Sequence, residues 1–106
     1  MAMQISRVRD VLVYYRERMS QLHVMPAALD PDYPGNKALR ERLEYVANFI
    51  DRAIDLVEQE PERREKIMRW YGFIQGALYM IEMFSVEQLK AHSNPDVAPP
   101  QIGDKT

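Results

Sequence analysis

The acidic side chains between residues 41 and 58 have the types and spacing that come closest to catalytic chemistry. They recur three, four or seven positions apart, so they share one side of any helix formed here: Glu41, Glu44, Asp51, Asp55 and Glu58. Carboxylates one turn apart on a helix can hold Mg²⁺, and Mg²⁺ can polarise the phosphate of a nucleotide. A magnesium-dependent phosphohydrolase is therefore the first function to consider for this sequence.

Helical nucleotide pyrophosphatases of the MazG and dUTPase type hold Mg²⁺ with Glu-x-x-Glu on one helix and Glu-x-x-Asp on the next. The stretch Glu41-Arg-Leu-Glu44 resembles the first half of that pattern. No Glu-x-x-Asp follows it, since Glu82 is the only acid in the body of the next expected helix. The acids also lie opposite the apolar seam of their own helix, where metal ligands would be solvated. We therefore interpret them as a charged solvent face and keep a divergent MazG-like pyrophosphatase as the third functional hypothesis.

Other residue types add no catalytic or metal centre. The chain has no cysteine, which excludes disulfides and thiolate ligands. His23 and His92 lie singly at the ends of expected helices, and we interpret them as ordinary polar end residues. No serine lies in a nucleophile-elbow sequence, and "GFIQG" lacks the strand-turn-helix context of a phosphate-binding loop. We expect no catalytic residue, no metal and no cofactor, and we predict a protein that is not an enzyme.

Basic side chains concentrate in one place, at Arg63, Arg64, Lys66 and Arg69. Trp70 and Tyr71 follow directly. A basic patch beside aromatic side chains can bind a phosphate, a nucleotide or an acidic protein surface. Glu60, Glu62 and Glu65 alternate with these basic residues and cancel most of the positive electrostatic field of the patch. The second hypothesis is therefore a nucleotide or small-molecule binding protein. Its expected ligand-binding residues are Arg69, Trp70, Tyr71 and Gln75.

The overall composition limits the class of protein. A chain of 106 residues with 46% hydrophobic and 28% charged residues is typical of one globular domain. Its formal charge of −2 argues against a nucleic-acid binder that works by neutralising phosphates. Arg7 and Asp10 interrupt the apolar run that a signal peptide would need. The most apolar stretch, residues 69–84, contains Arg69, Gln75 and Glu82, and these polar side chains would be costly inside a membrane. We expect no nucleic-acid or membrane partner and a cytoplasmic location.

Apolar residues spaced three or four apart predict three long amphipathic helices, over 4–22, 37–58 and 61–83. Asn36 is placed to cap the second helix, and Pro61 suits the first turn of the third. The first two seams consist of Ile5, Val8, Leu12, Tyr15, Met19 and Leu22, followed by Leu39, Leu43, Val46, Ile50, Ala53 and Val57. A tight connection at 59–60 and a proline-rich one at 23–36 favour an all-α, up-down-up three-helix bundle.

A short fourth helix is predicted after residue 84. Ser85 and Gln88 have the spacing of a capping box, and Val86 and Leu89 form its apolar pair. From Ser93 onward the segment has three prolines, a glycine and few apolar residues, which is typical of a disordered tail. We therefore expect a helical bundle domain over 1–92 and a flexible C-terminal tail over 93–106.

The expected third helix is apolar on nearly all sides. One stripe suits the bundle core: Ile67, Trp70, Tyr71, Ile74, Ala77, Leu78 and Ile81. A second face collects two glycines and their neighbours: Met68, Gly72, Gly76, Tyr79, Met80 and Met83. Glycines four apart let another helix come close, and methionines pack adaptably around it. We expect this face to be a homo-oligomer interface, most simply a two-fold dimer. The alternative is that the fourth helix or the proline-rich segment of the same chain covers this face.

The stretch "MRWYGFIQGALYMIEMFSVEQLKAHSNPD" resembles the C-terminal part of small uncharacterised proteins of tailed bacteriophages. Their pattern is an Arg-Trp-x-Gly-Phe-x-Gln-Gly-x-Leu core, followed by a short Glu-containing helix that ends near His-x-x-Pro. The matching residues are Arg69, Trp70, Gly72, Phe73, Gln75, Gly76, Leu78, Phe84, Ser85, Glu87, Leu89, His92 and Pro95. The resemblance implies a phage gene expressed in a bacterial cytoplasm, and it implies no activity.

The function that the sequence favours is a non-enzymatic helical interaction protein. It would form a homodimer, and as a phage accessory protein it would bind a host protein. The nucleotide or small-molecule binding protein remains the alternative.

Overall fold

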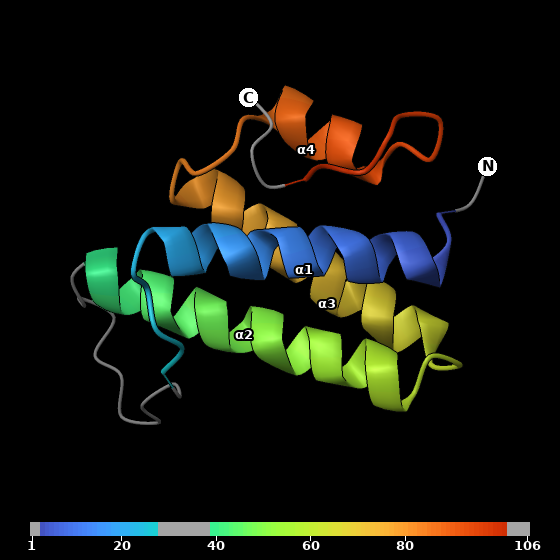
Figure 1. Ribbon diagram of the computed structural model, residues 1–106, viewed down its shortest axis with the longest axis horizontal. Helices are drawn as coiled ribbons and strands as arrows, with labels where there is room; N and C mark the ends of the chain where they lie inside the picture. The colour runs from blue at the N-terminus through green and yellow to red at the C-terminus, as the bar shows by residue number, and fades with distance from the viewer. Residues whose placement is uncertain (1–2, 28–38, 102–106) are drawn as a thin grey trace.

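The computed structural model describes residues 3–27 and 39–101, which form four helices (Figure 1). These are α1 (Ile5–Gln21), α2 (Leu39–Gln59), α3 (Arg64–Met80) and α4 (Val86–Ser93). The three long helices run up, down and up, and the short α4 packs on α1 and α3, beside the face of α1 that points away from α2. The predicted all-α bundle with a short fourth helix is confirmed, and the described residues contain no strand.

The core forms where the apolar seams of the three long helices meet. Its fully buried side chains come from all three: Val8, Val11, Leu12, Tyr15, Met19, Ile50, Ile54, Ile67, Ile74 and Leu78. The centres of the predicted seams are therefore buried as expected. Leu22 and Leu39, at the outer ends of the seams, are about half exposed. Trp70, Ala77 and Ile81 of the predicted core stripe are partly buried at its edge.

The third helix is shorter at both ends than the predicted span of 61–83. Residues 61 and 62 form a turn, closed by the Arg63 amide bonding to the Glu60 carbonyl at 3.0 Å, so α3 begins at Arg64. At the other end Glu82 has a left-handed backbone, with φ of 61°. The amides of Glu82 and Met83 bond back to the carbonyls of Tyr79 and Leu78, both at 3.0 Å, which is the Schellman pattern that ends helices. The prediction placed Glu82 inside the helix, and it lies beyond the helix end.

The first helix ends by the same device, since His23 has φ of 58° and the Val24 amide bonds to the Met19 carbonyl at 2.9 Å. The predicted start of α1 at residue 4 and end at residue 22 are each correct to within one residue. The predicted start of the second helix, with its Asn36 cap and Lys37, lies outside the described residues. So does most of the proline-rich connection.

The capping box of α4 is confirmed. The Gln88 amide donates to Ser85 Oγ at 3.1 Å, and the Ser85 amide donates to Gln88 Oε1 at 2.8 Å. Leu89 is buried, whereas Val86, its predicted apolar partner, is exposed. Ser93 is the last residue of α4. Residues 94–101 continue beside α1, where Pro99, Pro100 and Gln101 line a hollow with Tyr14. The predicted flexibility of the tail stays a prediction.

Candidate functional site

An exposed apolar face runs along α3. We call it the outer face of α3 and define it by Arg69, Gly72, Phe73, Gly76, Tyr79 and Met80, all of them exposed. Phe73 is 56% exposed, Tyr79 48% and Met80 76%. Apart from its chain neighbours and the backbone of its own helix, a Cβ placed on Gly72 or Gly76 would meet no atom within 4 Å. The fourth helix therefore does not cover the two glycines.

The six residues predicted for an oligomer interface divide between this face and the core edge. Gly72, Gly76, Tyr79 and Met80 lie on the outer face, as the spacing predicted. Met68 and Met83 are partly buried against the core. Phe73 also belongs to the face, although it is not among the six predicted residues. Its position on the wheel, next to Gly76 and Met80, is the signal that could have placed it there.

An aromatic cluster borders the outer face on the side of α2. The ring of Phe49 stands edge-on to Trp70, with centroids 5.6 Å apart, and to Phe73 at 5.1 Å. Together with Arg69 these three rings line a shallow hollow of about 290 Å³. The aromatic side chains extend the apolar surface from α3 onto α2.

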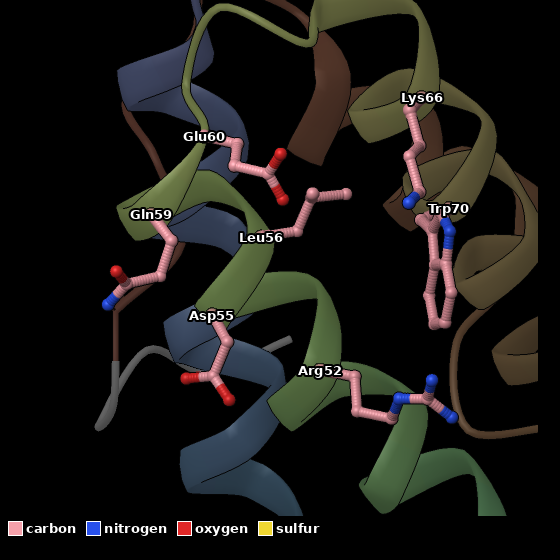
Figure 2. A pocket seen from close by; sticks show the side chains of 7 residues that line it. All are labelled: Arg52, Asp55, Leu56, Gln59, Glu60, Lys66 and Trp70. Atoms are coloured by element: carbon pink, nitrogen blue, oxygen red, sulfur yellow. The ribbon is translucent and has the colours of Figure 1, made fainter.

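Beyond Trp70 lies a second hollow, which we call the Trp70 groove (Figure 2). It has a volume of about 230 Å³ between α2 and α3. Its lining is Arg52, Asp55, Leu56, Gln59, Glu60, Lys66 and Trp70. The guanidinium carbon of Arg52 lies 5.4 Å from the centre of the Trp70 ring, within range of a cation–π contact.

The four residues predicted to bind a ligand do not share one surface. Arg69 is exposed and pairs with Glu65 at 3.3 Å, and Trp70 faces the groove beside α2. Tyr71 and Gln75 turn toward α1 and α4. The reason is the helix itself, because successive residues on a helix point about 100° apart. The structure thus brings Trp70 together with Lys66 of the predicted basic patch and with Arg52, which the sequence pattern does not connect with a ligand.

A network of polar side chains joins α3 to α1 and α4. We call it the tyrosine–histidine cluster: Tyr15, Tyr71, Gln75, His92 and Ser93. Gln75 Nε2 lies 2.9 Å from the Tyr71 hydroxyl, 3.0 Å from Ser93 Oγ and 3.2 Å from the Tyr15 hydroxyl. The Tyr15 hydroxyl in turn lies 2.8 Å from His92 Nδ1. Gln75 Nε2 also lies 3.4 Å from the carbonyl oxygen of Leu89. An amide nitrogen has two hydrogens, so Gln75 can donate to two of these four acceptors at a time.

Burial determines the electrostatics of this cluster. Tyr15 is fully buried and His92 is 5% exposed. Burial, followed by the repulsion that ionised Tyr15 and Tyr71 hydroxyls would exert on each other, raises the pKa of the Tyr15 hydroxyl, and burial likewise raises the pKa of Tyr71. Burial and the nearby Arg7 guanidinium lower the pKa of His92. All three side chains are therefore held neutral, and the cluster has the character of an internal anchor for α4.

Arg7 completes the anchor. Its side chain is buried, and its Nε donates to the carbonyl of His92 at 2.9 Å while Nη2 donates to that of Ala91 at 3.2 Å. Nη1 donates to the carbonyl of Val97, beyond the helix. A cation at the C-terminal end of a helix satisfies its open carbonyls and complements its dipole. His92 is thus not the ordinary end residue that the sequence predicted, because it is enclosed between Arg7 and the aromatic side chains of α1.

No metal centre is assembled in the described residues, where no three His, Asp or Glu side chains lie close enough to hold an ion. Over the same ranges no helix is both long and apolar enough to cross a membrane. Comparison of the chain with protein-family models, with curated proteins and with solved structures finds no match.

Proposed function

We propose that this protein is a non-enzymatic helical interaction protein that forms a two-fold dimer through the outer face of α3. The observation that carries the proposal is the exposure of Phe73, Tyr79 and Met80 on one face of one helix. Large apolar side chains gathered in this way are typical of protein-binding surfaces. Gly72 and Gly76 lie between them and leave room for a second helix backbone.

A second copy of the chain suits this face when the two α3 helices run antiparallel. If the pair is centred between Gly72 and Gly76, each Arg69 falls opposite the other copy's Tyr79, which favours a cation–π contact. Each Met68 then falls near the other copy's Met80. A parallel pair would instead place Arg69 opposite its own copy, and the like charges would repel. The antiparallel arrangement also opposes the two helix dipoles.

The mass in solution tests the proposal. Sedimentation equilibrium should give a dimer for the wild-type chain and a monomer for Gly76→Leu and Met80→Glu, which block or charge the outer face. Val86→Glu is the matched control, because Val86 is an exposed apolar residue on α4 and should leave the dimer intact. Circular dichroism checks that each variant is folded. A wild-type chain that is monomeric at tens of micromolar overturns the dimer.

A bacterial host protein is the alternative occupant of the same face. The resemblance of residues 68–96 to tailed-phage proteins supports a setting in a bacterial cytoplasm, with the protein acting by covering a host surface. The experiment separates the two occupants. A monomeric wild-type chain that captures one host protein, and loses it in Gly76→Leu and Met80→Glu but not in Val86→Glu, would favour the host protein.

A further inference from the structure

The Trp70 groove combines one aromatic wall with two cationic side chains. Leu56 contributes an apolar side chain to the lining, and the indole of Trp70 forms the wall on the side of α3 (Figure 2). Arg52 reaches in from α2 on one side of the indole, and Lys66 from α3 on the other (Figure 2). Among the described residues no ion pair joins Arg52 or Lys66 to a carboxylate. Two cations beside one flat ring are thus available to a ligand.

The two acids of the groove do not cancel this charge. Glu60 Oε1 accepts a hydrogen bond from Arg63 at 3.2 Å, so its charge is already paired. The carboxylate of Asp55 is exposed and turns away from Trp70 (Figure 2). Arg52 and Lys66 are therefore the charges beside the indole that have no ion pair within the described residues, and they favour an anion there over a cation or a neutral molecule.

We propose that the Trp70 groove binds a small planar aromatic anion, a single ring system carrying one phosphate or carboxylate group. Arg52 would leave the indole for the anionic group, exchanging a cation–π contact for stronger charge-assisted hydrogen bonds. The ring of the ligand would then stack on the vacated face of Trp70. Lys66 adds a second positive charge at the other end of the indole.

The volume limits the size of the ligand. At about 230 Å³ the groove lies below the usual range for drug-sized ligands, so one ring with one anionic group fits better than a dinucleotide. The proposal does not rest on the dimer, because Arg52, Lys66 and Trp70 lie outside the outer face of α3. Its test can be run on the monomeric Gly76→Leu variant as well as on the wild-type chain, so the two proposals can fail separately.

Trp70 is the only tryptophan, so its fluorescence reports on the groove directly. Titration with phenyl phosphate or adenosine monophosphate, with excitation at the red edge of the indole band, should give a saturable change. Arg52→Gln and Lys66→Gln should each weaken the affinity about tenfold, as expected for the loss of one charge-assisted hydrogen bond. Arg42→Gln is the matched control, since Arg42 is an exposed cation on α2 outside the groove.

Inorganic phosphate and adenosine separate the two parts of the ligand, and both should bind at least about tenfold more weakly than adenosine monophosphate. Three results would each overturn the proposal. The first is no saturable change up to millimolar probe. The second is an affinity that Arg52→Gln and Lys66→Gln leave at the wild-type value. The third is adenosine binding as tightly as its monophosphate.

Discussion

The hydroxyl oxygen of Tyr15 lies 2.8 Å from Nδ1 of His92 and so joins the middle of α1 to the end of α4. The imidazole is packed among the rings of Tyr14, Tyr15 and Phe84, with centroids 5.6, 5.4 and 5.0 Å away. Gln75 donates to the same Tyr15 hydroxyl at 3.2 Å, which leaves the hydroxyl proton free to point at Nδ1. An imidazole ring whose Nδ1 accepts a hydrogen bond is uncharged, because both ring nitrogens of the charged form are donors. The fold therefore binds the uncharged form of His92.

The stability of the protein should fall as the pH is lowered below about 7. Burial, followed by the Arg7 guanidinium, lowers the pKa of His92 in the folded chain below its usual value of about 6.5. The unfolded chain then binds the proton more readily, so stability is complete above about pH 7 and is lost as the pH falls through about 6.5. One group contributes at most about 1.4 kcal/mol per pH unit. Urea denaturation between about pH 7.5 and 5.5 measures the slope.

Two variants control the pH prediction. His92→Asn keeps an acceptor near the Tyr15 hydroxyl but cannot titrate, so its stability should be nearly flat over the same range. His23→Asn changes an exposed histidine and should retain the wild-type slope. Asp51 cannot produce the effect, because burial raises the pKa of its carboxyl and a raised carboxyl pKa increases stability on acidification. Parallel curves for the wild-type chain and His92→Asn would contradict the assignment to His92.

Replacing Arg7 should loosen α4. Arg7→Met removes the donors to the carbonyls of Ala91, His92 and Val97 and should lower the free energy of unfolding by about 3 kcal/mol, because charge-assisted bonds in buried surroundings are lost. Hydrogen exchange should show the largest loss of protection in α4. Arg9→Met is the matched control. Arg9 pairs with Glu58 at 3.2 Å on the exposed surface, and its loss should cost less than about 1 kcal/mol. If the two substitutions lowered the free energy of unfolding equally, the proposed role of Arg7 as an anchor of α4 would be wrong.

The sequence predicted well those features of the fold that depend only on residues close together in the chain. The seams of the long helices follow from apolar spacing, since residues three or four apart share a helix face. The capping box of α4 follows from Ser85 and Gln88 alone. Such local patterns also predicted that Gly72 and Gly76 share a face.

The tyrosine–histidine cluster could not be predicted in the same way. Tyr15 and His92 are 77 residues apart, and Arg7 is 85 residues from the carbonyl that it binds at His92, so only the docking of α4 brings them together. Arg7 nevertheless left a signal, since it precedes Val11 by four positions and therefore lies on the apolar side of its helix. The end of α3 gave no signal of this kind, because Glu82 occupies the left-handed position where glycine is usual.

Glu82→Gly should stabilise the protein. The left-handed backbone at residue 82 costs a side-chain-bearing residue about 1 kcal/mol that glycine does not incur. Glu82 is exposed and forms no ion pair within the described residues, so little else should change. The free energy of unfolding should rise by about 1 kcal/mol in urea denaturation. Glu87→Gly is the control of opposite sign, since the same change inside α4 should destabilise the helix by up to about 1 kcal/mol. A loss of stability in Glu82→Gly would contradict the backbone argument.

Gly76→Ala should affect the single chain and the proposed dimer in opposite directions. Within one chain the new methyl group meets no atom within 4 Å apart from its chain neighbours and the backbone of its own helix, so the better helix propensity of alanine should raise the free energy of unfolding by about 1 kcal/mol. In a dimer that packs helix backbones closely at this point, the same methyl group crowds the interface and should raise the dissociation constant about tenfold. Denaturation at low protein concentration measures the first effect, and sedimentation equilibrium measures the second. Ser20→Ala, at an exposed position of α1, should leave the dissociation constant unchanged. If Gly76→Ala also leaves it unchanged while the wild-type chain is dimeric, the helices do not meet at Gly76 and the interface lies elsewhere.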